Sequence, residues 1–216
     1  MNTLSLKQNL IFIKTKNSIK KIIEEHGFPL ISKQISFLIN SYKKGNEEQR
    51  KKILNNQGFD GIPKKYWYLL DEKFDCSNIC CKLLRKDVAD EFSKTNNSGN
   101  YVGVTVYESK QRFMAYSSGG CIHKKHNTSW PIALFSEKEI WECVKKFNIK
   151  ISPQYELGYD RTGCLMCGYG KNNSNGYKDL YLFKKTSPKL YEISMNYKNN
   201  GVTYREALKK TGIIAP

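Results

Sequence analysis

The alternation of apolar and polar residues predicts a helical N-terminal third. Residues 19–26 place isoleucines on one face of a helix that Ser18 caps and a glycine ends. Residues 33–44 repeat this pattern behind Ser32, again with a glycine after the last turn. The apolar, β-branched run at 10–15 predicts a strand ahead of the first helix. A strand followed by helices is the beginning of an α/β pattern.

The same periodicity continues through the middle of the chain. Apolar residues four apart run from Cys80 to Phe92 and predict a helix that begins near Ser77. Residues 101–107 (YVGVTVY) predict the clearest strand of the sequence. The pair Ser136 and Glu139 predicts a capping box ahead of a strongly amphipathic helix. The fold class expected from these elements is α/β.

Length and composition limit the class of protein. The 216 residues are 39% hydrophobic and 26% charged, which suits one globular domain, or one domain with a small appendage. No apolar run approaches the roughly 20 residues that cross a bilayer, and the first residues lack the pattern of an export signal. Seven cysteines without an export signal indicate a reducing compartment. We therefore expect a cytoplasmic protein without a membrane partner.

The chain is strongly basic. Lysine and arginine number 36 against 20 aspartates and glutamates, which gives a net charge of +16. Such an excess fits binding to nucleic acid, to a membrane surface or to a small polyanion such as a nucleotide. Most of the basic residues are lysines spread along the chain, so a lysine-rich solvated surface explains the charge equally well.

Two pairs of cysteines carry the clearest chemical signal. Cys80 and Cys81 are adjacent in SNICCKLLRK, and Cys164 and Cys167 form a C-x-x-C between glycines in DRTGCLMCGYG. Neighbouring cysteines do not easily bond each other, because a disulfide needs Cα atoms farther apart than one trans peptide allows. Four thiolates are the full complement for a zinc ion or an iron–sulfur cluster. The sequence therefore predicts a four-cysteine metal centre.

The adjacent pair favours a cluster over a single ion. A lone zinc needs four sulfurs about 2.3 Å from one point, and structural zinc sites usually separate paired ligands by two or more residues. A [4Fe–4S] cluster offers separate iron corners, so neighbouring thiolates can each bind their own iron. The helix start before Cys80 favours thiolate over thiol, and nearby basic residues would offset negative charge: Lys82, Arg85, Lys86 and Arg161. The predicted cofactor is a [4Fe–4S] cluster, with zinc as the alternative.

Simpler interpretations stay open. Cys80 also fits a small core residue in the helical row, and C-x-x-C also occurs as a redox dithiol. Cys121, His123 and His126 supply only three zinc ligands within six residues, which makes a metal site there a weak hypothesis. Cys143 is expected to pack within its helix.

With these cysteines in view, the chain resembles the phosphoadenosine phosphosulfate (PAPS) reductase family, including its phage-encoded members. The 82 residues between Cys81 and Cys164 are near the separation in the cluster-bearing members. Four further segments look like family motifs: GFPLISKQIS, GVTVYESKQR, PIALFSEKEIWECV and DRTGCLMCGYG. The resemblance covers roughly residues 9–215.

The resemblance implies a fold and a division of the chain. The family fold is an adenine-nucleotide α-hydrolase-like α/β domain, in which an S-G-G-x-D-S loop holds the nucleotide's phosphates. No such loop precedes the ISK segment here, so the resemblance implies a truncated domain. Residues 1–60 would be a remnant of the nucleotide-binding half, and residues 61–216 a helical, cysteine-rich, cluster-binding half. The missing loop would be carried by a separate chain or lost.

The resemblance also implies a function. Family members are oxidoreductases of sulfur metabolism that bind an adenine nucleotide or sulfonucleotide, an adenylated sulfur compound, and attack it with a cysteine near the C-terminus. No cysteine follows Cys167, so no catalytic residue is assigned. The expected substrate-binding residues are those that match the family motifs or suit a sulfate or phosphate: Glu108, Ser109, Lys110, Arg112 and Arg161. Glu108 and Arg112, four residues apart, also fit a plain surface ion pair.

Two further hypotheses belong to different classes. A non-enzymatic four-cysteine zinc module that binds nucleic acid would use the net charge and the aromatic residues of YWYLL and GYGKNNSNGYKDLYLF, which can stack on bases. An interaction protein built on an inactive enzyme scaffold is the third possibility.

Overall fold

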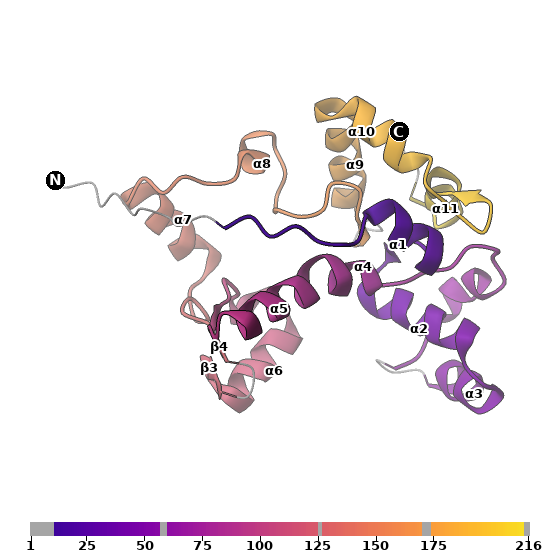
Figure 1. The fold of residues 1–216 in the computed structure, drawn as a ribbon, viewed down its shortest axis with the longest axis horizontal. Helices are drawn as coiled ribbons and strands as arrows, with labels where there is room; N and C mark the ends of the chain where they lie inside the picture. Colours follow the sequence, from indigo (N-terminus) through magenta and orange to yellow (C-terminus); the bar gives the residue numbers. More distant parts are fainter. Residues whose placement is uncertain (1–10, 57–59, 125–126, 170–173, 214–216) are drawn as a thin grey trace.

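The computed structural model describes residues 11–56, 60–124, 127–169 and 174–213. This described part is mixed α/β, with many helices and three small sheets (Figure 1). The predicted fold class is confirmed at this level. Within the described ranges, no helix has both the length and the apolar character needed to cross a bilayer.

The first helices form where their patterns predict them. Helix α1 (Ile19–His26) begins after Ser18, whose hydroxyl accepts a hydrogen bond from a backbone N–H of the first turn at 3.2 Å. Helix α2 (Lys33–Lys44) begins in the same way after Ser32, at 3.1 Å. Each of these bonds satisfies an amide that the helix itself leaves unpaired. Two short elements follow, α3 (Glu47–Asn55) and the 3₁₀ helix η1 (Lys64–Leu70).

The remaining elements alternate between short helices and very short strands. From residue 79 to residue 119 they are α4 (Ile79–Cys81), the π-helical turn η2 (Lys82–Lys86), α5 (Asp87–Thr95), β2 (Asn100–Tyr101), the 3₁₀ turn η3 (Val106–Glu108) and α6 (Lys110–Gly119). Then come β3 (Ile122–His123), β4 (Thr128–Ser129), α7 (Glu137–Lys146), α8 (Pro153–Glu156) and β5 (Gly168–Tyr169). The chain ends with α9 (Ser174–Thr186), α10 (Pro188–Met195), β6 (Lys198–Asn199), β7 (Val202–Thr203) and α11 (Tyr204–Lys210).

A small parallel arrangement of three extended segments connects distant parts of the sequence. Strand β1 (Leu30–Ile31) pairs with β5 in parallel, in the register Leu30 to Gly168. On its other side, Phe28 forms a parallel bridge with Cys76. The segment at 28–31 therefore lies between the chain that leads into Cys80 and the chain that leaves Cys167.

Two predicted strands are wrong. Residues 11–15 of the run at 10–15 form no strand, and their apolar side chains are exposed; Leu10 lies outside the described residues. Of residues 101–107, only Tyr101 belongs to a strand, β2, and the stretch ends in η3. A strand needs a paired neighbour for its backbone groups. Residues 11–15 pair with no described strand, and β2 pairs with β4 over only two residues.

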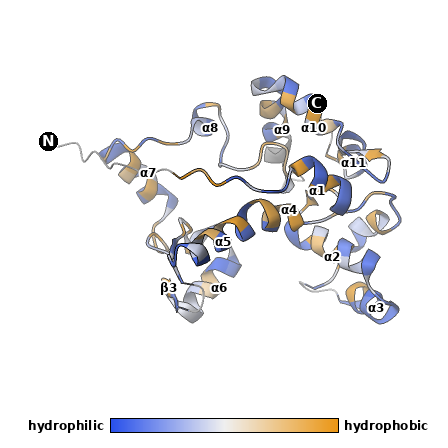
Figure 2. Ribbon diagram, viewed as in Figure 1, coloured by the Kyte–Doolittle hydropathy of each residue, from blue (hydrophilic) through white to orange (hydrophobic). Residues whose placement is uncertain are grey.

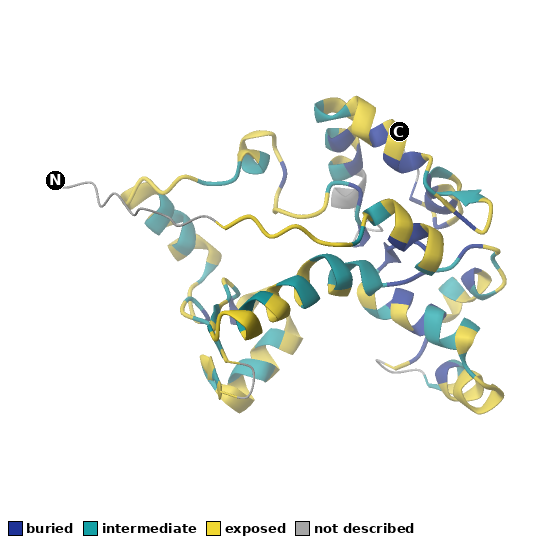
Figure 3. Ribbon diagram, in the orientation of Figure 1, coloured by how far each residue is buried: buried dark blue, intermediate teal, exposed yellow. Residues whose placement is uncertain are grey.

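The hydrophobic core is formed by the N-terminal and C-terminal parts of the chain packing together. Its cluster of buried residues runs from Ile23 to Cys76 and resumes at Met166 to reach Ile213. Helices α1, α2, α10 and α11 carry apolar residues toward this core and polar residues toward solvent (Figure 2). Figure 3 shows the buried residues concentrated in this part of the fold, whereas α5, α6 and α7 are half-buried or exposed. The core therefore draws on both halves of the division at residue 60.

Candidate metal centre

The four predicted ligand cysteines lie around one cavity. Cys80, Cys81, Cys164 and Cys167 all line a hollow of about 280 Å³, although two segments far apart in the sequence contribute them. The other lining residues are mostly apolar, from α1, the helix after Cys81, and α9 and α10: Ile19, Pro29, Leu84, Arg85, Leu165, Met166, Phe183, Leu190, Ser194 and Tyr197. The tertiary structure therefore brings together the residues that the sequence predicted to meet.

The first pair lies at the start of a helix, as expected. The hydroxyl of Ser77 accepts a hydrogen bond from the backbone N–H of Ile79 at 3.1 Å, and the helix starts at Ile79. Cys80 and Cys81 are the next two residues, so both lie in the first turn. Leu84 lies four residues after Cys80, and Arg85 lies four residues after Cys81. Both line the same cavity as the cysteines. A π-helical turn directly after Cys81 widens the helix here, a feature frequent at functional sites.

The second pair is held in a tight turn against the small parallel sheet. The backbone N–H of Cys167 donates to the carbonyl of Cys164 at 3.0 Å, which closes the C-x-x-C loop. Gly168 then donates to the carbonyl of Pro29 at 3.1 Å as β5 begins. A Cβ atom at Gly168 would lie 2.4 Å from that carbonyl oxygen. Glycine is required because the two backbones approach so closely.

Two buried tyrosines fasten the cysteine segments to the fold. The hydroxyl of Tyr169 donates to the carbonyl of Ser77 at 2.9 Å, which links the strand after Cys167 to the segment before Cys80. The hydroxyl of Tyr204 donates to the carbonyl of Met166, inside the C-x-x-C loop, at 2.7 Å. Tyr204 is fully buried and Tyr169 is 7% exposed. Sequence reasoning missed both residues, because no spacing rule connects a tyrosine to a carbonyl 92 or 38 residues away.

The cavity disfavours a free thiolate at Cys80, so the expectation that the helix start favours thiolate there is wrong: burial outweighs the helix dipole. Burial is the main reason that the pKa of the Cys80 thiol is raised to about 12, and the neighbouring thiols of Cys81 and Cys167 add to the increase. Burial is also the main reason that the pKa of the Tyr169 hydroxyl is raised, and the thiols of Cys80, Cys167 and Cys81 add to this increase. Such groups stay protonated in the absence of a metal, and a positive ion beside them reverses the balance. The sulfurs of the two pairs are therefore close enough to influence one another.

The predicted basic residues take different positions around the cavity. Arg85 lines it, and Arg161 donates to the carbonyl of Tyr169 at 3.5 Å. Lys82 instead forms an ion pair with Asp87 at 2.7 Å on the surface. Of the four predicted basic residues, Arg85 lines the cavity, whereas Lys82, Lys86 and Arg161 lie outside its lining.

The thiols do not converge on one point. Among the described residues, no group of three or more Cys, His, Asp or Glu side chains is arranged closely enough to hold a single metal ion. Four sulfurs around one zinc would lie only about 3.8 Å apart, given Zn–S bonds of about 2.3 Å. A cluster accepts a wider spacing, because each thiolate binds a different iron. Among the described residues, the four cysteines thus line one cavity without forming a site for a single ion.

The other predicted substrate residues lie on a different part of the fold. Glu108 and Arg112 form an ion pair with each other, and both side chains are partly exposed. Glu108 also accepts a hydrogen bond from the backbone N–H of Thr105, and Ser109 caps α6. Lys110 is the first residue of that helix. Figure 1 shows α6 separated from the chain that follows α8, where Arg161 lies. The ion-pair interpretation of Glu108 and Arg112 accounts for this geometry.

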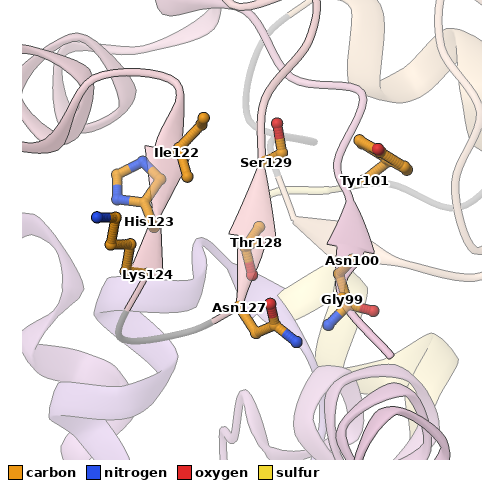
Figure 4. Close-up of a pocket in the computed structure, with 9 residues that line it drawn as sticks. All are labelled: Gly99, Asn100, Tyr101, Ile122, His123, Lys124, Asn127, Thr128 and Ser129. Atoms are coloured by element: carbon orange, nitrogen blue, oxygen red, sulfur yellow. The ribbon is translucent and has the colours of Figure 1, made fainter. Parts of the chain in front are cut away.

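A second hollow, of about 370 Å³, opens at the small sheet formed by β2, β4 and β3. Figure 4 shows its lining side chains on the three strands, with the carboxamide of Asn127 beside Gly99 and Asn100. The rings of His123 and Trp130 pack at a tilt of 47°, with their centroids 4.7 Å apart. Cys121 is exposed, and His126 lies outside the described residues. The weak zinc hypothesis for this segment gains no ligand set from the described residues.

Comparisons with known proteins show a partial similarity to an archaeal protein. The chain matches no family profile, and no solved structure matches it. It is 28% identical over 123 residues to an uncharacterized protein, MJ0066, of Methanocaldococcus jannaschii. The match covers 54% of this chain and 23% of that relative, so the chain spans about a quarter of the relative's length. The likeness to PAPS reductases accordingly rests on the sequence motifs alone.

Proposed function

We propose that the chain is an iron–sulfur protein of the PAPS reductase family, with a [4Fe–4S] cluster bound by Cys80, Cys81, Cys164 and Cys167. The observation that carries this proposal is the common cavity that all four thiols line, despite the 82 residues between the two pairs. Chance would rarely bring two such pairs to one apolar hollow. Each further cysteine of the chain, by contrast, lies outside that lining.

The surroundings of the four thiols support a cluster. A cavity of about 280 Å³ has the volume of about nine water molecules, comparable with four irons and four sulfides. Its walls are mostly apolar, and the guanidinium of Arg85 would offset the negative charge of a cluster. When bound, the cluster supplies one-electron redox chemistry or a structural cross-link between the two segments. The tyrosine hydrogen bonds described above hold both ligand segments in place.

The proposed fold is a truncated adenine-nucleotide α-hydrolase-like domain. The three parallel segments around Phe28–Ile31 are the part of the chain that such a domain would extend into a larger sheet. The proposed ligand is an adenine nucleotide or sulfonucleotide, and a separate chain with an S-G-G-x-D-S loop would complete its phosphate site. Arg161 is the candidate contact nearest the cysteines, while Glu108, Ser109, Lys110 and Arg112 would contribute only if their surface meets that partner. A reducing compartment such as the cytoplasm suits seven cysteines that form no disulfide.

Elemental analysis of protein purified without oxygen tests the cluster. We expect about four irons and four sulfides per chain, with the broad visible absorption of an iron–sulfur protein. Cys81→Ser and Cys164→Ser should lose most of the iron, whereas the matched variants Cys121→Ser and Cys143→Ser should keep it. Protein that holds neither iron nor sulfide would reject the proposal.

The alternative function, a zinc module that binds nucleic acid, draws on the distribution of charge. Residues 1–86 carry 17 basic and 8 acidic residues, and residues 161–216 carry 10 basic and 3 acidic residues. These two segments, which form the cysteine cavity, therefore hold all of the net charge of +16. Zinc without sulfide in the purified protein would favour this function. Its second requirement is an affinity for RNA or DNA that falls steeply as salt increases.

A further inference from the structure

Helix α7 is an amphipathic helix with little to pack against. Its capping box is complete, with Ser136 and Glu139 each bonded to the other's backbone N–H. Ile140, Val144 and Phe147 recur at the spacing of one helical face. None of the residues of α7 is buried, and Phe147 just after it is 65% exposed.

The described chain offers α7 only marginal support. Trp141 packs edge-on against Tyr155, with ring centroids 5.2 Å apart. No other described helix or strand packs extensively along α7. An isolated helix of about ten residues is marginal in water, and most helical stability comes from packing an apolar face. Ile140 and Val144 are only half-buried within the chain, and Phe147 on the same face is exposed. This face therefore has apolar surface left for another molecule to cover.

The segment around α7 shares this lack of burial. Residues 87–160 contribute 3 of the 26 buried apolar residues in the described chain, but 10 of the 19 exposed large ones. Figure 3 shows this part of the molecule almost without buried residues. Exposed apolar surface on this scale is typical of a protein–protein interface.

The accessible surface of the chain is larger than its mass predicts. It measures 15,324 Å², whereas a compact protein of 25.0 kDa exposes about 10,200 Å². Residues outside the described ranges, given the full surface of an unfolded chain, would account for about 3,700 Å². Between about 1,400 and 5,100 Å² of excess remains, which is on the scale of what each partner of an obligate dimer buries.

The charge of the segment favours a second copy as the occupant. Residues 87–160 carry 9 basic and 9 acidic residues, whereas the rest of the chain carries the whole net charge of +16. An acidic protein or a nucleic acid would be drawn to the basic remainder. Two copies of a strongly basic chain can approach each other with least repulsion through this neutral segment.

The charges of α7 also set the orientation of the pair. Its first turn holds Glu137 and Glu139, and its last turn holds Lys145 and Lys146. An antiparallel arrangement places the acidic turn of one helix beside the basic turn of the other, and a two-fold axis makes both contacts equivalent. We infer that α7 is the contact helix of a two-fold dimer, packed antiparallel against α7 of a second copy of this chain.

The mass of the purified protein tests the dimer. Light scattering at about 10 μM should give twice the chain mass of 25.0 kDa. Phe147→Asp should weaken association about 100-fold and give the single-chain mass. Phe37→Asp, on α2 and 49% exposed, lies outside residues 87–160; it is the matched control and should leave the dimer intact. A wild-type protein that stays monomeric, or a dimer unaffected by Phe147→Asp, would overturn the inference.

Charge reversal tests the orientation while controlling for misfolding. Glu137 lies in the first turn of α7 and Lys145 in the last, so an antiparallel pair brings the acidic turn of each helix beside the basic turn of the other. Glu137→Lys and Lys145→Glu should each weaken self-association about tenfold, because each brings like charges together. An equimolar mixture of the two variants should regain the dimer mass, since every facing pair is again opposite in charge. A mixture no more dimeric than either variant alone would refute the antiparallel arrangement.

Discussion

Replacing Tyr169 by phenylalanine removes one oxygen atom from the link between the two cysteine pairs. The ring stays, so the packing of this residue, which is 7% exposed, is preserved. What disappears is the hydrogen bond of 2.9 Å from its hydroxyl to the carbonyl of Ser77. The hydroxyl also interacts with the side chain of Ser36. Tyr169→Phe therefore isolates the contribution of this one hydroxyl, whose bond to Ser77 links the two cysteine segments.

The expected loss of stability follows from the burial of the bond. A buried carbonyl left without its donor costs about 1–3 kcal/mol. For a chain of this length, each kcal/mol lowers the unfolding midpoint by about 2–4 °C. We expect Tyr169→Phe to lower the midpoint of the metal-free protein by about 4–8 °C, for a central cost of about 2 kcal/mol. The iron-loaded protein should also release iron to a chelator about tenfold faster, because outer hydrogen bonds that orient ligands commonly change metal affinity by that factor or more.

Thermal unfolding followed by circular dichroism, together with chelator kinetics, checks both expectations. Tyr181→Phe, at a tyrosine that is 51% exposed, is the matched control and should change neither quantity. A Tyr169→Phe protein with an unchanged midpoint and unchanged iron release would show that the bond does not hold the two cysteine pairs together.

Two further substitutions test other parts of the argument. Gly168→Ala should destabilise the fold by about 2–3 kcal/mol in denaturant unfolding, because its Cβ would lie 2.4 Å from the Pro29 carbonyl oxygen. Gly163→Ala, with open space around its Cβ, is the control and should be neutral. Equal effects of the two substitutions would contradict this reasoning. Hydrogen bonds from Ser136 lower the pKa of Glu139 in the folded protein. The ionised carboxylate therefore stabilises the fold at pH values above its pKa in the unfolded chain, about 4.3. This stabilisation is lost as the pH falls through the lower pKa of the folded state. Glu139→Gln should thus lower the midpoint of thermal unfolding at pH 7, and by progressively less below about pH 4. A difference in midpoint between the variant and the wild type that does not change with pH would argue against the capping role.

The sequence predicted local structure best where side chain and backbone interact over a few residues. The starts of α1, α2 and α7 lie where Ser18, Ser32 and Ser136 place them, because a capping hydroxyl bonds an amide only two or three positions away. The strands were predicted worst. Residues 11–15 and 102–105 have strand-like composition, but a strand forms only when a distant segment pairs with it.

The sequence by itself determined the set of cysteines, since the spacing of Cys80–Cys81 and Cys164-x-x-Cys167 is a local property of the chain. Only the tertiary structure decided that the two pairs share one cavity, because the segment at 28–31 pairs with Cys76 through Phe28 and with β5 through β1. It also decided which other residues serve that cavity: Arg85 and Tyr169 lie at it or beside it, whereas Arg112 pairs with Glu108 elsewhere. Contacts between residues far apart in sequence depend on the packing of the whole chain, and no local pattern encodes them.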